Sequence, residues 1–287
     1  MIIRKFSDKR PKIVIFQGSP RDKDTCPHME SKTQKVIDFL VDEYSFMVDF
    51  VVIDLSVNQS KQPTIQPCKG CVSTAGGYHC HWKCTCYAKG DEKRPDLMYE
   101  ADIYDHLETC DAFMVFSPVH WYSVTSQVKA LFDRLVCANQ TLTREQAIEI
   151  MGKGNAKNPD ITGPMSQSGQ YDHLLKNHLE GKYAAFYLHG DNGANDYQKN
   201  PKPESLKNYE LDEKMLSENT KIAVMPIVTQ CRYSGINVPD DLIETFYMNQ
   251  GEPYYTSNID LVNNMRPFES ASNLLERLLT YLQFTVN

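Results

Sequence analysis

Short apolar runs alternate with amphipathic stretches along the chain. The first run, Ile13-Val14-Ile15-Phe16, is followed by the small-residue loop Gly18 to Arg21 and then by apolar residues at helical spacing from Val36 to Val41. A continuous apolar run between turn signals is typical of a strand buried on both faces of a parallel sheet. Ser31 stands three residues before Gln34, a pattern that marks a helix start. The pattern predicts a strand, a loop and a helix, in that order.

Four further apolar runs predict four more strands, and the stretches between them have helical periods. The predicted strands are 48–55, 112–116, 182–188 and 221–228, and the predicted helices are 99–110, 128–135, 206–219 and a closing helix with a leucine stripe at 274–282. Such alternation is typical of an α/β protein with a parallel sheet. We expect a single domain over residues 1–287, with its core at about 11–230 and a C-terminal extension at 231–287.

Length and charge limit the classes of partner. A chain of 287 residues can bury a full core as one elaborated domain. Its 30 basic and 37 acidic residues give a net charge of −7 without a basic tract, which argues against nucleic acid. Neither a bilayer-length apolar run nor the apolar middle of a signal peptide is present. We expect a cytoplasmic protein that binds neither nucleic acid nor membrane.

The loop after the first strand is a candidate phosphate site. A strand that leads into a helix N-terminus offers backbone N–H groups and the positive end of the helix dipole. Ser19, Arg21, Ser31 and Thr33 could add hydroxyl groups and a guanidinium. Alternatively, Ser31 only caps the helix and the preceding residues form a surface turn. Neither the Walker pattern nor the triple-glycine dinucleotide fingerprint is present.

A second candidate site follows the third predicted strand, where open parallel sheets place their ligands. The residues are Pro118, Val119, His120, Trp121 and Tyr122. The alternative is that the two aromatic rings are half-buried side chains that close a helix start. The position after a strand favours a ligand-binding loop.

These two motifs, with Ser126, Lys129, Asp133 and Arg134 after the second, resemble the NADPH-dependent FMN reductase family of the flavodoxin-like superfamily. The resemblance covers roughly the first half of the chain. It implies a flavodoxin-like three-layer sandwich with a five-stranded parallel sheet, in which the first motif holds the FMN phosphate and the second lies along the flavin ring. It also implies that His189 and Gly190, after the fourth strand, border the flavin, although this loop could be a plain turn.

Two features depart from the family pattern. The stretch between Arg21 and Ser31 is longer than expected, and His120 stands where the family more often has tyrosine. The resemblance implies a homo-oligomeric oxidoreductase that uses NADPH to reduce a small-molecule electron acceptor such as a flavin, a quinone or a nitroaromatic. Because the flavin carries the chemistry, no catalytic residue is assigned. The alternatives are a flavodoxin-type carrier, an iron–sulfur flavoprotein and a binding protein without flavin.

Five of the nine cysteines fall in one segment that lacks helical or strand periodicity. They are Cys68, Cys71, Cys80, Cys84 and Cys86, with His79 and His81 between them. Thiolates and imidazoles could bind zinc or an iron–sulfur cluster, although the spacing fits neither a zinc ribbon nor a ferredoxin. Buried thiols in a compact loop are the alternative. Both interpretations stay open at this point.

Overall fold

The computed structural model describes residues 10–21, 30–56, 63–75, 78–121, 123–151, 169, 171–190, 219–247 and 265–284. Five strands form one sheet in the order β2-β1-β4-β6-β7, and every neighbouring pair is parallel. The strands are β1 (Lys12–Gln17), β2 (Asp49–Asp54), β4 (Ala112–Pro118), β6 (Tyr183–Gly190) and β7 (Ile243–Tyr247). The predicted five-stranded parallel sheet is confirmed.

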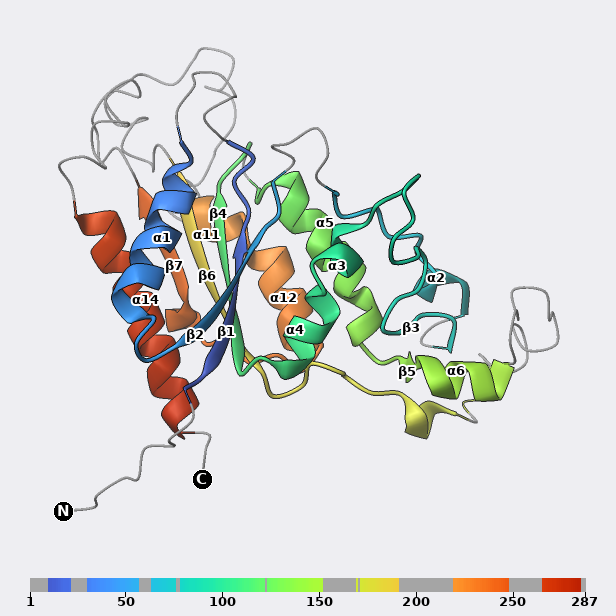
Figure 1. Ribbon diagram of the computed structural model, residues 1–287. Helices are drawn as coiled ribbons and strands as arrows, with labels where there is room; N and C mark the ends of the chain where they lie inside the picture. The colour runs from blue at the N-terminus through green and yellow to red at the C-terminus, as the bar shows by residue number, and fades with distance from the viewer. Residues whose placement is uncertain are drawn as a thin grey trace, which may run out of the picture.

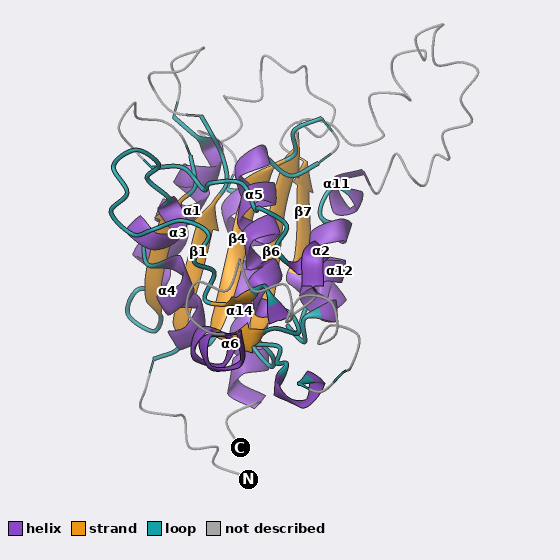
Figure 2. Cartoon of the chain, turned by 90° about the vertical axis from the view of Figure 1, so that its right-hand side faces the viewer, coloured by secondary structure: helices purple, strands orange, loops and turns teal. Residues whose placement is uncertain are grey.

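The order of the strands indicates at which edge of the sheet a ligand is expected to bind. From β1 the chain adds β2 on one side and then β4 on the other, which is the flavodoxin-like order 2-1-3-4-5. The reversal makes a topological switch point between β1 and β4, and doubly wound folds bind ligands there, outside the carboxyl ends of the strands. Figure 2 shows β1, β4, β6 and β7 side by side behind α5 (Ser126–Arg134).

Helices cover both faces of the sheet, so the molecule has three layers (Figure 1). One face packs against α1 (Lys32–Tyr44) and α14 (Arg266–Phe284) through a cluster that includes Ile13, Ile15 and Leu274. The other face contributes Val14 and Phe16 to a second cluster, which is covered by α4 (Ile103–Thr109), α5 and α12 (Met225–Tyr233). The alternation of β1 side chains between two buried clusters explains why this strand is continuously apolar.

The fifth strand lies elsewhere than the sequence pattern predicts. Residues 221–228, predicted as a strand, belong mostly to α11 (Asn219–Ile222) and α12. Val224, Ile227, Val228 and Cys231 are buried at helical spacing, and a proline in the first turn of α12 suits a helix start. The prediction of a strand at 221–228 is therefore wrong, and β7 is the fifth strand.

Residues beyond 230 complete the sandwich. Part of the segment that we expected to be a C-terminal extension supplies β7 to the sheet and α14 to one covering layer. The predicted helix at 206–219 falls outside the described residues except for its last position. The limits of the predicted domain stay a prediction.

A smaller unit containing the cysteine-rich segment packs beside α5 (Figure 1). We call residues 63–75 and 78–96 the cysteine lobe. The elements in and around it are α2 (Val72–Ala75), β3 (His81–Trp82), α3 (Leu97–Glu100), β5 (Leu142–Thr143) and α6 (Arg144–Met151), with 3-10 turns at Leu135–Ala138 and Asp172–Leu174. A further 3-10 turn at Asp240–Leu242 precedes β7 in the main sheet. β3 and β5 pair in parallel as a second, two-stranded sheet. Among the helices that the structure describes, none has the length and apolarity to cross a membrane.

Candidate functional site at the carboxyl edge of the sheet

The loop after β1 is held against β4 and α5 by its own backbone. The Gly18 N–H donates to the carbonyl of Phe116 at 2.8 Å, and the Thr125 hydroxyl donates to the Gly18 carbonyl at 2.7 Å. A Cβ atom at Gly18 would lie 2.4 Å from a methyl carbon of Val128. Glycine is needed here because the backbone approaches α5 more closely than a side chain allows. The start of the loop is thereby fixed at the switch point.

The predicted hydroxyl residues lie at this edge and are buried. Ser19, Ser31 and Thr33 are 5%, 4% and 1% exposed. Ser31 is the N-cap of α1, and its Oγ accepts from the Gln34 N–H at 3.2 Å, as the capping alternative expects. Ser19 donates its N–H to the side-chain oxygen of Gln17, and its Oγ accepts from the Arg21 N–H at 3.4 Å. The polar loop is therefore shaped by its own hydrogen bonds before any ligand arrives.

A buried imidazole joins this loop to the end of β6. His189 Nε2 lies 2.6 Å from Thr33 Oγ1, and its side chain is buried. Burial, and to a smaller extent the basic side chains of Lys32, His120 and Arg21, lower the pKa of His189 to about 3. The ring is consequently neutral at physiological pH. The lowered pKa also indicates that three basic side chains lie near the His189 imidazole, beside the N-terminus of α1.

The second predicted loop lies next to His189. Pro118 is paired with His189 in the β4–β6 register, and the Val119 N–H donates to the His189 carbonyl at 2.8 Å. His120 and Ser123 exchange backbone hydrogen bonds across a tight turn. Tyr122 lies outside the described residues. Both predicted loops and the end of β6, including Gly190, therefore meet at one edge.

Trp121 stands at the tip of this turn. Its φ is +48°, a left-handed conformation that is unusual for a bulky residue, and its side chain is 92% exposed. The alternative of a half-buried ring does not describe Trp121. A large rigid ring is thus presented at the carboxyl edge of the sheet.

Three residues of this edge were not predicted from the sequence. Gln17 orients Ser19, Thr125 holds Gly18, and Lys32 acts on His189. A buried glutamine at the end of an apolar strand is a signal that sequence analysis could have used. Thr125 and Lys32 are unremarkable residue types at helix starts, and only their spatial position assigns them a role.

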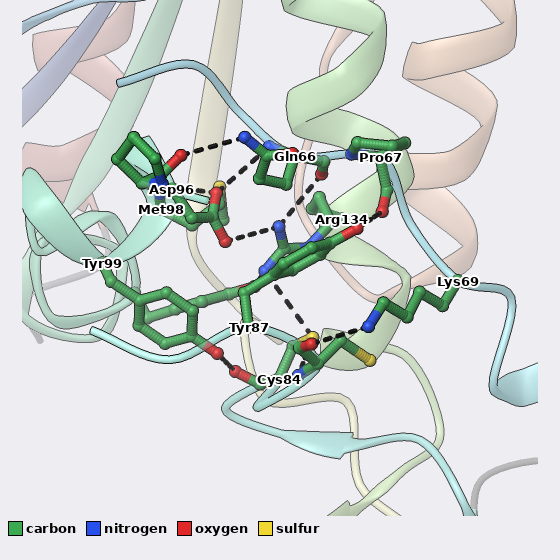
Figure 3. A network of polar contacts seen from close by, with 12 residues as sticks. Gln66, Pro67, Lys69, Cys84, Tyr87, Asp96, Met98, Tyr99 and Arg134 are labelled. Carbon is green, nitrogen blue, oxygen red and sulfur yellow. Dashed lines mark hydrogen bonds and ion pairs between the residues drawn. The ribbon is translucent and has the colours of Figure 1, made fainter. Parts of the chain in front are cut away.

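Arg134, a charged residue at the end of α5, is fully buried. Its Nη1 donates to Asp96 Oδ2 at 2.7 Å and to the Gln66 carbonyl at 3.0 Å, and both side chains of the ion pair have 0% exposure (Figure 3). Asp96 also caps α3 by accepting from the Met98 N–H. By contrast, Lys129 and Asp133 on the same helix form an exposed ion pair. Arg134 therefore anchors the cysteine lobe to α5.

Further contacts tie the lobe around this guanidinium (Figure 3). The Tyr87 ring lies 4.9 Å from the guanidinium carbon of Arg134, a cation–π contact, and its hydroxyl donates to the Pro67 carbonyl at 2.8 Å. The Tyr99 hydroxyl donates to the Cys84 carbonyl, and Lys69 Nζ donates to the Cys86 carbonyl at 3.0 Å. These contacts hold the segments of the lobe against α5 and against one another.

The five thiols of the lobe are reduced and differ in environment. Cys71 Sγ and Cys86 Sγ lie 3.3 Å apart, and Arg134 Nη2 lies 3.7 Å from Cys84 Sγ. Hydrogen bonds with Cys86, together with the Arg134 charge, lower the pKa of Cys84 to about 5 despite burial. Burial raises the pKa of Cys80 to about 12.

Within the described part of the chain, no three His, Cys, Asp or Glu side chains form a group that could hold a metal ion. The metal site at Cys68, Cys71, Cys80, Cys84 and Cys86 stays a prediction.

The fold is a flavodoxin-like α/β sandwich, and two polar loops meet at its switch point. The family model described as NADPH-dependent FMN reductase matches residues 11–158, which is 148 of the 287 residues. The chain belongs to this family, and the resemblance of the two motifs is confirmed. Membership makes it an FMN-dependent NAD(P)H oxidoreductase, and the electron-carrier alternatives are not favoured.

Comparisons with individual proteins give distant likenesses. No curated protein matches the chain. RosB with bound 8-demethyl-8-formylriboflavin-5'-phosphate is 13% identical, with 96% of this chain and 82% of that chain covered and a TM-score of 0.49. General stress protein 14 from Treponema denticola, in complex with FMN, is 13% identical, with coverages of 94% and 99% and a TM-score of 0.45. A putative quinone reductase from Klebsiella pneumoniae is 13% identical, with coverages of 94% and 85% and a TM-score of 0.47.

Proposed function

We propose that the carboxyl edge of the sheet holds FMN, with its phosphate in a cradle formed by Ser19, Arg21, Ser31 and Thr33 and its ring along residues 118–121. The observation that carries this assignment is the action of Lys32, His120 and Arg21 on the buried Thr33–His189 pair at the N-terminus of α1. Basic side chains, hydroxyl groups and a helix N-terminus together suit a phosphate. The donor set at this edge fits the cofactor of the family.

Each residue of the cradle has a separate task. Arg21 supplies a permanent charge and charge-assisted hydrogen bonds, and the Ser19 and Thr33 hydroxyls supply neutral ones. His189, because it is neutral and buried, fixes the orientation of the Thr33 hydroxyl without adding charge. Gly18 keeps the loop close enough to β4 for these groups to share one edge. The protein therefore contributes binding and orientation.

Bound FMN supplies the two-electron transfer between a nicotinamide and an acceptor. Trp121 offers an exposed ring beside the proposed flavin position, on which a planar nicotinamide or acceptor can stack. NADPH is the proposed donor, because the family is described by that cofactor. The proposed acceptors are flavins, quinones or similar small planar molecules.

Two finer statements belong to the same proposal. We place the protein in the cytoplasm and expect it to act as a homo-oligomer. The aromatic stretch around residues 246–255 is a candidate for contact with a second copy, although only its first two residues lie in the described part. Phe246 itself packs into the α1–α14 cluster.

The test is NADPH oxidation by FMN-loaded protein with a quinone acceptor, measured beside flavin content. Trp121→Ala should keep FMN, since the cradle is separate, yet lower turnover through loss of a positioning surface. Tyr233→Ala is the matched control, because Tyr233 is an aromatic residue 73% exposed at the far end of α12. If FMN-loaded wild-type protein fails to oxidise NADPH, the proposal is wrong and a carrier role takes its place.

A further inference from the structure

Three cysteines of the cysteine lobe lie close together. Cys71 Sγ lies 3.3 Å from Cys86 Sγ, and the Cys86 N–H donates to Cys84 Sγ at 3.5 Å. Cys71 and Cys86 are partly exposed, whereas Cys84 is 8% exposed. The oxidoreductase activity proposed for the carboxyl edge uses none of these groups. Their arrangement therefore calls for a separate explanation.

The two chain segments that carry these thiols are held together by contacts in which no thiol takes part. The Tyr87 hydroxyl donates to the Pro67 carbonyl, and Lys69 Nζ donates to the Cys86 carbonyl. Lys69 also lies over the Tyr87 ring, 4.6 Å from its centroid. These contacts hold segments 67–71 and 84–87 side by side in addition to the contact between the two sulfurs. The thiol pair is preorganised.

We propose that Cys71 and Cys86 form a redox-active dithiol site, which hydroperoxides oxidise to an intramolecular disulfide. A disulfide bond is about 2.05 Å long, so the sulfurs need to approach by only about 1.3 Å. The separation of 15 residues closes a loop within the lobe. Partial exposure of both thiols lets a small oxidant reach them, which distinguishes this pair from the buried Cys84 and Cys80.

The chemistry balances without help from the flavin. One thiolate attacks the O–O bond of the hydroperoxide and becomes a sulfenic acid, while the alcohol or water leaves. The second thiol then displaces water from that sulfenic acid and forms the S–S bond. Two thiols and one hydroperoxide thus give one disulfide, one alcohol and one water. Two equivalents of a low-molecular-weight thiol reverse the oxidation by thiol–disulfide exchange.

The neighbouring Cys84 offers a competing partner for Cys86. A bridge between residues two apart in sequence closes a very small ring, which strains the geometry that disulfides require. The Arg134 contact and the Tyr99 bond to its carbonyl also hold Cys84 in place. We therefore assign the disulfide to Cys71, and the experiment separates the two pairs.

The experiment treats the full-length FMN-loaded protein with hydrogen peroxide, blocks the remaining thiols and identifies linked peptides by mass spectrometry. Wild-type protein should lose two hydrogens, yield a Cys71–Cys86 linked peptide, and recover both thiols with dithiothreitol. Cys71→Ser and Cys86→Ser should each give no such link and should accumulate a sulfenic acid that dimedone traps. Cys68→Ser, a partly exposed cysteine of the same lobe, should behave as wild type.

Circular dichroism and FMN content check that each variant is folded. A Cys84–Cys86 link, or irreversible oxidation without a link, would overturn the proposal. The proposal would also be overturned if the thiols did not react until a chelator had removed a metal ion. That outcome would favour the metal site instead. These results are independent of NADPH turnover, so the dithiol site and the proposed function can fail separately.

Discussion

The carboxyl edge of the sheet and the cysteine lobe are both polar, but they are built in opposite ways. At the edge, the basic side chains of Lys32, His120 and Arg21 lie close enough to the buried, neutral imidazole of His189 to lower its pKa. At the lobe, the buried cation Arg134 of α5 is matched by the buried carboxylate of Asp96. On the proposed function, the charge of the edge binds a ligand, whereas the charge of Arg134 stabilises the attachment of the lobe.

The largest expected effect comes from breaking the internal pair of the lobe. Arg134→Met should lower the free energy of unfolding by about 3–5 kcal/mol, because Asp96 is left as an unpaired buried charge. Urea denaturation of wild type and variant measures it. Lys129→Met removes an exposed pair on the same helix and should cost no more than about 0.5 kcal/mol.

The same Arg134→Met variant tests whether the lobe and the carboxyl edge are independent of each other. FMN affinity of folded Arg134→Met protein should equal that of wild type, since no contact of the cradle passes through Arg134. A destabilisation below about 1 kcal/mol would show that the ion pair does not anchor the lobe. A parallel loss of FMN would show that the lobe and the edge are one unit.

The next effect concerns the edge alone. Arg21→Ala should weaken FMN binding by about 1.5–3 kcal/mol, or roughly tenfold to a hundredfold, through the loss of a charge-assisted hydrogen bond. Flavin titration of the apoprotein measures it. The matched control is Arg10→Ala, which should leave FMN affinity unchanged. Arg10 lies before β1, at the opposite end of that strand from Arg21, and pairs with Asp49. Equal affinity in both variants would mean that Arg21 belongs to an ordinary surface turn.

The smallest effect, taken per pH unit, is a pH dependence of stability. The pKa of His189 is about 3 in the folded chain and near 6.5 when unfolded, so the unfolded state binds more protons between these values. Stability should therefore fall as pH drops below about 6.5, by at most about 1.4 kcal/mol per pH unit from this group.

Denaturation of the apoprotein at several pH values checks this dependence. His189→Asn should flatten the slope between pH 6.5 and 4, and His173→Asn, on an exposed turn, is the control. An unchanged slope in His189→Asn would place the imidazole in contact with solvent.

The edge was largely predictable from sequence because its parts are local. A buried strand followed by Gly18, Ser19 and Arg21, and then by a capped helix, is a pattern of short-range signals. The Pro118 to Trp121 motif likewise follows its strand directly. Four of the five strands were predicted for the same reason. The effect of Lys32 on the pKa of His189 was not predicted, because lysine is common at a helix start and the sequence does not show which residues lie near it.

The lobe was not predictable, because its order depends on contacts between distant residues. Arg134 and Asp96 are 38 positions apart in the sequence. The segment between Cys68 and Asp96 has no regular spacing of apolar residues that would predict which side chains are buried. An arginine in an amphipathic helix is usually exposed, so its burial contradicts the prior expectation. The fifth strand failed for a related reason: a short apolar run at 221–228 fits a buried helix and a strand equally well.

The central claim is that the carboxyl edge recognises the phosphate of FMN, and the most direct test is to titrate the apoprotein with FMN and with riboflavin, which lacks the phosphate. The account predicts that FMN binds at least about tenfold more tightly than riboflavin to wild-type protein, because charge-assisted hydrogen bonds hold the phosphate. It predicts that this ratio narrows in Arg21→Ala and persists in Arg134→Met. Equal affinities of wild-type protein for FMN and riboflavin would contradict it.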